Sequence, residues 1–220
     1  MPKKTNREYR EMSLAIVPDV EERADGDEAE KMTVAGYAST FNEPYVLFSD
    51  EDLIYMEQVD ARAFDNTDMS DVIMQYDHEG RVFARISNNT LTVKPDDKGL
   101  YIEADLGGTE LGRGLYEEIR GGYTDKMSFG FTVDGDEEVR TESEDGRVEI
   151  LRTITSVSRL YDVSAVSIPA NGATSIGVTT RKQIDGAIEE IRAERLAAEK
   201  EKLERYRVEV KARAMLGGNE

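Results

Sequence analysis

Alternating apolar and polar positions dominate the middle of the chain. Between residues 33 and 168, short stretches with a period of two are separated by clusters of Asp, Asn and Gly. A period of two places successive side chains on opposite faces of a strand, and such clusters favour turns. Many short strands with few helices between them are typical of an antiparallel sheet or barrel. The pattern predicts strands at 33–41, 71–76, 82–86, 90–94, 100–106, 126–133, 148–155 and 158–168.

One helix is predicted inside this region. Thr109 is a suitable N-cap, and Glu110 follows in the first turn, where a negative charge is favourable. Gly121 and Gly122 end the helical spacing. The predicted apolar stripe consists of Leu111, Leu115, Tyr116 and Ile119.

The stretch 182–215 predicts a second and much longer helix. It contains no proline, is rich in Ala, Glu, Lys and Arg, and would be about 50 Å long if fully helical. Two interpretations stay open, a solvated helix with one docked face and an arm that binds a partner or forms a coiled coil. Both rest on an apolar stripe too thin for a helix buried on all sides, namely Ile184, Ile188, Ile191, Leu196, Leu203 and Val210.

The N-terminal residues are charged and show little periodicity. Such a segment buries too little apolar surface to order itself, so we expect a mobile arm in which 12–17 can add an edge strand. The apolar share of 39% and the charged share of 34% also fit a compact domain with solvated segments attached. We therefore divide the chain into an N-terminal arm (1–31), a folded domain (32–181) and a helical C-terminal arm (182–220).

Composition and charge remove several classes of function. The formal net charge is −18, and phosphate recognition needs clustered Lys and Arg, so no nucleic acid is expected as a partner. The chain has no cysteine and one histidine, which excludes thiol catalysis and a multi-histidine zinc site within one chain. No apolar run approaches the roughly 20 residues that span a bilayer, so we expect no membrane and a cytoplasmic protein.

Few mechanisms remain after these exclusions. The glycine pairs 107–108 and 121–122 match neither a phosphate-binding nor a dinucleotide-binding loop, and we expect no cofactor and no metal. Metal-dependent hydrolysis by carboxylates alone stays open, because the chain has 46 acidic residues. Serine hydrolysis needs a hydroxyl beside an imidazole and an acceptor for the second ring nitrogen. His78 ends the apolar segment 71–78 before a turn, a position suited to a general base but also to an ordinary surface histidine.

Ser128 is the candidate nucleophile. Within 126–133 the large residues Met127, Phe129 and Phe131 share one face and must take the core, so Ser128 is expected to face a groove. Gly130 lies on the same face as Ser128 and is expected to leave room for a substrate backbone. A polar position on a half-exposed strand would show the same pattern.

Asp162 is the candidate third member of the site. It is a single carboxylate in a strand of apolar and small residues, and burying an unpaired charge is costly. An imidazole would serve as its partner, and so would an arginine such as Arg159 or Arg85.

A series of short motifs follows these residues along the chain. In order they are VAGYASTFN (34–42), the 57–64 stretch that ends in RAF, YDH (76–78), KGL (98–100), MSFGF (127–131), and DVS (162–164) with PAN (169–171). Together, over about 32–179, they resemble the prohead proteases of tailed bacteriophages, the serine peptidases that mature the capsid. In this resemblance His78 matches the family histidine and Ser128 the family serine. Asp162 stands where the family usually has Glu, one methylene longer, so its backbone must come closer or its carboxylate plays a supporting role.

The resemblance implies a fold, an activity and partners. The fold would be α+β, a mostly antiparallel β-barrel ringed by helices as in the herpesvirus proteases, with the long C-terminal helix attached. The activity would be cleavage of the scaffolding segment of the major capsid protein, and of the protease itself, inside the procapsid in the host cytoplasm. The arm at 182–216 would offer self-association. A non-catalytic assembly or scaffolding factor with the same fold is the alternative, and an esterase or acyl transferase with the same nucleophile is a third.

Overall fold

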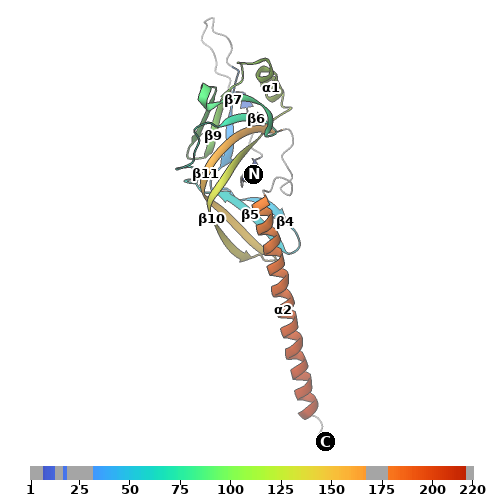
Figure 1. The fold of residues 1–220 in the computed structure, drawn as a ribbon. Coiled ribbons are helices and arrows are strands. Elements are labelled where there is room, and N and C mark those ends of the chain that lie inside the picture. Colours follow the sequence, from blue (N-terminus) through green and yellow to red (C-terminus); the bar gives the residue numbers. More distant parts are fainter. Residues whose placement is uncertain (1–6, 13–16, 19–31, 167–177, 217–220) are drawn as a thin grey trace, which may run out of the picture.

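The computed structural model describes residues 7–12, 17–18, 32–166 and 178–216. Their strands form two sheets (Figure 1), and residues of both sheets, among them Ile102 and Phe129, belong to one large buried apolar cluster. The larger sheet has the order β1-β10-β11-β5-β4, with β6 beside β11 and β7 beside β6, and the smaller has the order β2-β3-β9-β8. The strands are β1 (Glu8–Met12), β2 (Val17–Pro18), β3 (Thr33–Thr40), β4 (Tyr45–Ser49), β5 (Leu53–Val59), β6 (Ile73–Tyr76), β7 (Glu79–Arg85), β8 (Leu91–Pro95), β9 (Gly99–Asp105), β10 (Lys126–Glu142) and β11 (Val148–Val166), with a short 3-10 turn at Ile86–Asn88.

Most of the predicted strands are confirmed, with three differences. The strands expected at 148–155 and 158–168 are one continuous strand, β11, whose described part ends at Val166. The strand expected at 126–133 extends to Glu142 as β10. β4 and β5 were not predicted at all. In β5 the buried positions alternate from Leu53 to Val59, but the buried residue in the middle is the charged Glu57, which hides the period of two.

β11 is the strand that organises the larger sheet. Its first half, from Val148 to Ile154, pairs in parallel with β5, and its second half, from Asp162 to Ala165, pairs in parallel with β6. On its other side it pairs with β10 in an antiparallel ribbon with several register shifts. The sheet is therefore mixed rather than antiparallel, and the pairing of the described strands does not close into the expected barrel.

The two helices begin and end close to the predicted positions. α1 (Glu110–Arg120) starts after Thr109, whose side chain accepts a hydrogen bond from the Gly112 backbone N–H. Its buried face includes Leu115 and Ile119, but Leu111 is half exposed and does not belong to the apolar stripe. α2 (Val178–Leu216) is the predicted long helix. Among the described residues, no helix is apolar enough over a sufficient length to cross a membrane.

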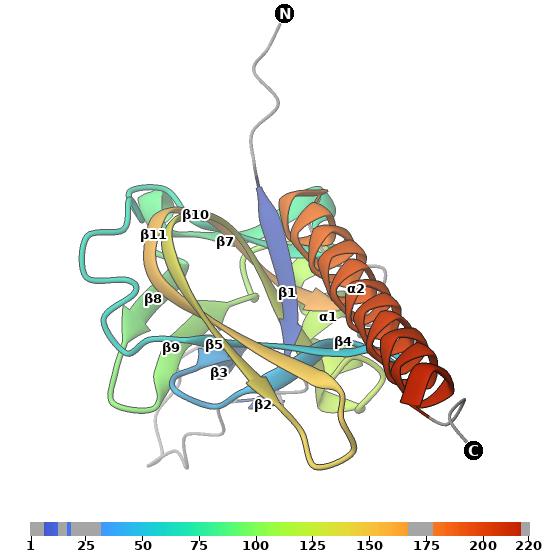
Figure 2. The same ribbon diagram turned by 90° about the horizontal axis from the view of Figure 1, so that it is seen from below.

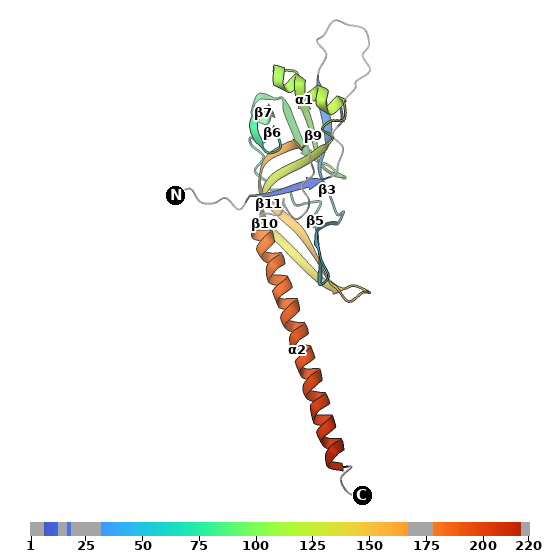
Figure 3. The same cartoon turned by 90° about the vertical axis from the view of Figure 1, so that its right-hand side faces the viewer.

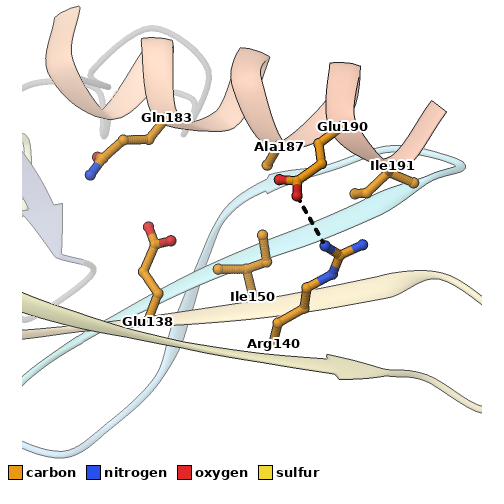
Figure 4. Close-up of a pocket in the computed structure, with 7 residues that line it drawn as sticks. All are labelled: Glu138, Arg140, Ile150, Gln183, Ala187, Glu190 and Ile191. Atoms are coloured by element: carbon orange, nitrogen blue, oxygen red, sulfur yellow. Dashed lines mark ion pairs between the residues drawn. The ribbon is translucent and has the colours of Figure 1, made fainter. Parts of the chain in front are cut away.

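The first turns of α2 dock on the domain, and the rest of the helix projects away from it (Figure 3). Ile184 and Ile191 are buried against an apolar cluster that includes Leu53, Tyr55 and Ile150. A cavity of about 330 Å³ lies where this part of α2 passes over the β10–β11 ribbon, and Figure 4 shows the side chains that line it. The side chains that line it are Glu138, Arg140, Ile150, Gln183, Ala187, Glu190 and Ile191, so it lies beneath the helix and not at the candidate active site.

The N-terminal segment contributes a strand to the larger sheet. β1 pairs antiparallel with β10 from Glu8 opposite Phe131 to Met12 opposite Met127. In Figure 2 it runs between the β10–β11 ribbon and the start of α2. The expected mobile arm therefore does not include 8–12, because Glu8 and Arg10 find buried partners that are distant in sequence. Of the edge strand expected at 12–17, residues 13–16 lie outside the described part.

Candidate active site

His78 is placed by a tight hairpin turn. β6 and β7 are joined by Asp77 and His78, and Tyr76 pairs with Glu79 across the turn. Both turn residues have positive φ, 48° and 59°, as a two-residue hairpin of this type requires. A non-glycine residue held in that region costs on the order of 1 kcal/mol, a strain that concentrates at functional sites. The Asp77 N–H donates to the Ala165 carbonyl oxygen at 2.9 Å, which ties the turn to the end of β11.

Ser128 lies on β10, on the opposite side of β11 from this turn. β11 pairs with β10 at Ser164 opposite Ser128, and with β6 at Ser164 opposite Gln75. The imidazole reaches across, and its Nε2 lies 2.5 Å from Ser128 Oγ. The His78 side chain keeps 13% of its surface exposed, whereas Ser128 is fully buried.

Asp162 completes a hydrogen-bonded chain of three side chains. Its carboxylate oxygens lie 3.1 and 3.0 Å from His78 Nδ1. Nδ1 therefore carries the proton that it donates to Asp162, which leaves the Nε2 lone pair to accept the Ser128 hydroxyl proton. The shorter Asp side chain suffices, because β11 is paired directly with the strand that leads into the His78 turn.

Arg7 is a member of the site that the sequence did not indicate. Its Nη2 donates to Asp162 Oδ2 at 2.7 Å, and its guanidinium stacks near the rings of Tyr9 and Tyr161. The arginines that we considered as partners of Asp162 lie elsewhere, Arg159 near Asp68 at 3.6 Å and Arg85 near Asp71 at 3.1 Å. No spacing signal connects Arg7 with Asp162, since the two are 155 residues apart.

Two expectations about the surroundings of Ser128 are wrong. Gly130 does not leave room for a substrate, because a Cβ there would lie 2.5 Å from Asp162 Oδ1 and 2.8 Å from Arg7 nitrogens. The glycine instead makes room for the carboxylate and its guanidinium partner. Ser128 does not face an open groove either, because its Oγ is also 2.9 Å from the backbone oxygen of Arg10 in β1.

A second polar cluster lies beneath β1. We call Glu8, Arg10, Glu57, Arg152 and Thr180 the charge cluster; all are almost completely buried. Arg10 Nη2 and Arg152 Nη1 donate to Glu57 Oε2 at 2.7 and 2.8 Å. The same two nitrogens lie 2.5 and 3.1 Å from Glu8 Oε2, to which Thr180 donates at 3.0 Å. The cluster therefore joins β1, β5, β11 and the first turn of α2.

The neighbouring charges in the charge cluster favour ionised Glu8, Arg10 and Arg152, and they favour a neutral Tyr45 beside Glu57. Burial raises the pKa of the Glu8 carboxyl, but Arg10 and Arg152 outweigh it, so this pKa is lowered overall. Burial and then the charge of Glu57 raise the pKa of Tyr45, whose hydroxyl donates to Glu57 at 2.6 Å. Among the described residues, no group of three acidic, His or Cys side chains could hold a metal ion.

The geometry defines a class of site. A hydroxyl, an imidazole and a buried carboxylate joined in this order by hydrogen bonds are the constellation of serine hydrolases. The chain belongs to the family of caudovirus prohead serine proteases, which matches residues 18–187 of 220. The match ends inside α2 and begins after β1. No match was found among curated proteins or among solved structures.

Proposed function

We propose that this chain is the endopeptidase that matures a phage prohead, with Ser128 as nucleophile, His78 as general base and Asp162 as the group that orients the imidazole. The observation that carries the proposal is the position of one imidazole between a hydroxyl at 2.5 Å and a buried carboxylate at 3.0 Å, in a chain of this family. Because the chain has only one histidine, no other imidazole in it can take this bridging role.

The proton movements follow from the hydrogen bonds. Ser128 Oγ attacks a peptide carbonyl carbon while His78 Nε2 takes its proton, and the resulting imidazolium is stabilised by Asp162 through Nδ1–H. His78 then returns the proton to the leaving amine. In the second half-reaction a water gives a proton to His78 and adds to the acyl carbon; the bond to Ser128 Oγ then breaks, and His78 returns the proton to that oxygen. In this structure Arg7 donates to Asp162 Oδ2 and holds the carboxylate in place beside the imidazole.

Family membership supports the choice of substrate. A prohead protease acts on capsid proteins during assembly, so we assign cleavage to the scaffolding segment of the major capsid protein, and then to the chain itself, inside the procapsid in the host cytoplasm. A test is to co-express the chain with its coat protein and sequence the new termini. We expect defined cuts in the coat protein with the native chain and none with Ser128→Ala. Hydrolysis of small esters without any cut in the coat protein would favour the esterase alternative.

The far half of α2 favours an additional role in assembly. Leu196, Leu203 and Val210 are about half exposed and are spaced by seven residues, the repeat that lines one seam of a coiled coil. One apolar residue per heptad gives a weak seam, and many weak copies inside a shell add up through effective concentration. This part of the helix supports self-association or capture of coat protein, the role that a scaffolding factor without catalysis would keep. If the Ser128→Ala chain is still incorporated into procapsids, this role is separate from proteolysis.

A further inference from the structure

Two residues of β1, and Arg7 directly before it, each contact a different member of the candidate triad. Arg7 donates to Asp162 at 2.7 Å, the Tyr9 ring lies edge-on to the His78 ring at 4.5 Å, and the Arg10 backbone oxygen lies 2.9 Å from Ser128 Oγ. We infer that β1 occupies the edge of β10 on which an extended peptide substrate binds, and that β1 must leave this edge before a peptide can be cut. The inference rests on the proposed function and adds where the substrate binds and what covers that place.

The position of β1 is the one that an added substrate strand would take. β1 is the terminal strand of the larger sheet and pairs directly with β10, with Glu11 opposite Ser128. Peptides are commonly captured as an extra strand on such an edge, where main-chain hydrogen bonds hold the extended backbone beside the reacting group. While β1 stays in place, this edge of β10 has no free hydrogen-bonding groups along residues 127–131.

The contact at Ser128 is unproductive for catalysis. The single hydroxyl proton of Ser128 has two acceptors, His78 Nε2 and the Arg10 carbonyl oxygen. When the proton points to Arg10, the general base cannot remove it, and the oxygen of Ser128 faces a carbonyl oxygen rather than a carbonyl carbon. The complete burial of Ser128 fits a resting state that is closed to substrate.

The charge cluster holds β1 in this position and also allows it to leave. Successive strand residues face opposite ways, so Arg7 and Tyr9 contact the triad while Glu8 and Arg10 enter the charge cluster. Departure of β1 removes one acid and one base together. Arg152 and Glu57 stay paired at 2.8 Å, so no single buried charge is left without a partner. The family match begins at residue 18, and the matched range therefore does not include β1.

The test compares two arginines of the charge cluster in the full-length chain. Arg10→Met and Arg152→Met each remove one buried guanidinium that contacts Glu57 and Glu8, but only Arg10 belongs to β1. The probe is a small fluorophosphonate. Mass spectrometry measures the rate at which it attaches to Ser128. Only variants with the native far-UV circular dichroism spectrum are compared. Releasing β1 should accelerate labelling by about tenfold or more in Arg10→Met, and Arg152→Met, which loosens β1 only through Glu8, should show a smaller gain.

A third variant and a second readout keep the inference open to refutation. Tyr9→Ala removes the ring contact with His78 but no buried charge, and its Ser128 should also be labelled faster than in the native chain. If Arg10→Met does not fold, this variant tests the role of β1 in its place. In the native chain, the backbone amides of β1 (residues 8–12) should exchange their hydrogens faster than the amides of β10 and β11. Equal or slower labelling of Ser128 in folded Arg10→Met and in Tyr9→Ala would overturn the role of β1 while the proposed function stands. Failure of the probe to label Ser128 in any form of the chain would instead overturn the proposed function, and this inference with it.

Discussion

The two polar clusters on the two faces of β1 differ in how their groups are paired. In the charge cluster two arginines and two glutamates are buried together, and each acid contacts both bases. Around Ser128, one proton is shared between two acceptors, and the imidazole keeps a small exposed surface. Complete pairing fixes a structure, whereas a hydroxyl proton with two possible acceptors and a partly exposed imidazole can take part in a reaction. Substitutions around Ser128 should therefore abolish activity without unfolding the chain, and substitutions in the charge cluster should reduce its stability.

The largest effect is expected from Ser128→Ala. Loss of a triad nucleophile reduces kcat by roughly 10⁶, and removal of one hydroxyl from a strand leaves the core residues in place. The rate of coat-protein cleavage and the melting temperature should be measured for the same preparation of each variant. Ser164→Ala is a matched control, because Ser164 is equally buried and lies opposite Ser128, and its hydroxyl has no hydrogen bond to any described residue. Comparable losses in both variants would contradict the assignment.

Asp162→Asn should have the next largest effect. The amide keeps the shape of the side chain but can favour the wrong imidazole tautomer, and it costs on the order of 10⁴ in rate at other triads. It also leaves the Arg7 guanidinium without its anionic partner. Steady-state rates at neutral pH measure this change, and a loss below about tenfold would mean that Asp162 does not orient the ring.

On the other face of β1, Glu57→Gln should reduce stability rather than chemistry. Removing one partner of a buried ion pair costs about 3–5 kcal/mol, because the remaining charges lose their compensation. Arg10 and Arg152 both donate to Glu57. Asp68→Asn is the control, since Asp68 forms a solvent-exposed ion pair with Arg159, and such pairs contribute little to stability. Denaturant unfolding should separate the two variants, and equal midpoints would show that the charge cluster is not needed for the fold.

The effect of truncating α2 depends on the point of truncation. Ending the chain after Ala198 keeps the docked Ile184 and Ile191, so peptide cleavage should continue while incorporation into procapsids fails. Ending it after Arg181 removes both isoleucines from the core and should cost about 2–5 kcal/mol for each. Thermal melting and incorporation assays distinguish these results. If the longer product, residues 1–198, does not fold, the whole helix belongs to the domain.

The smallest expected effect is a loosening of β1 in acid. The pKa of Glu8 is lowered in the folded chain from an ordinary value of 4.5, so its carboxylate stabilises the fold above that value. This contribution declines as the pH falls below 4.5 toward the folded-state pKa. Hydrogen exchange at residues 8–12 should therefore lose protection over that range, earlier than the centre of the larger sheet. Unchanged protection down to the pH of global unfolding would contradict a role for Glu8 in holding β1.

The sequence predicted the local elements better than the contacts between distant segments. Both helices and the strands between Thr33 and Val166, except β4 and β5, follow from periodicity, caps and glycines, which are local signals. The parallel pairing of β11, the placement of β5 and the insertion of β1 depend on buried charges such as Glu57 and Arg10. Burial of a charge contradicts the apolar pattern and can be recognised only when its partner, far along the chain, is known.

The site shows the same division between local and distant signals. His78, Ser128 and Asp162 could be proposed from their strands and from the family motifs, and the structure brings these three side chains together. Arg7 and Tyr9 could not, because they lie in a charged segment without periodicity and before the matched range. The purpose of Gly130 was also hidden, since only the fold shows that the Asp162 carboxylate fills the space beside it.

The most direct test of the account is to map the site of covalent modification by diisopropyl fluorophosphate. The reagent forms a stable bond with an activated serine oxygen and needs no knowledge of the cleavage sequence. The account predicts one adduct, on Ser128, in the native chain and none in His78→Ala, both measured by peptide mass spectrometry. A chain that cuts coat protein while its adduct lies on another serine, or while Ser128 stays unmodified, would contradict it.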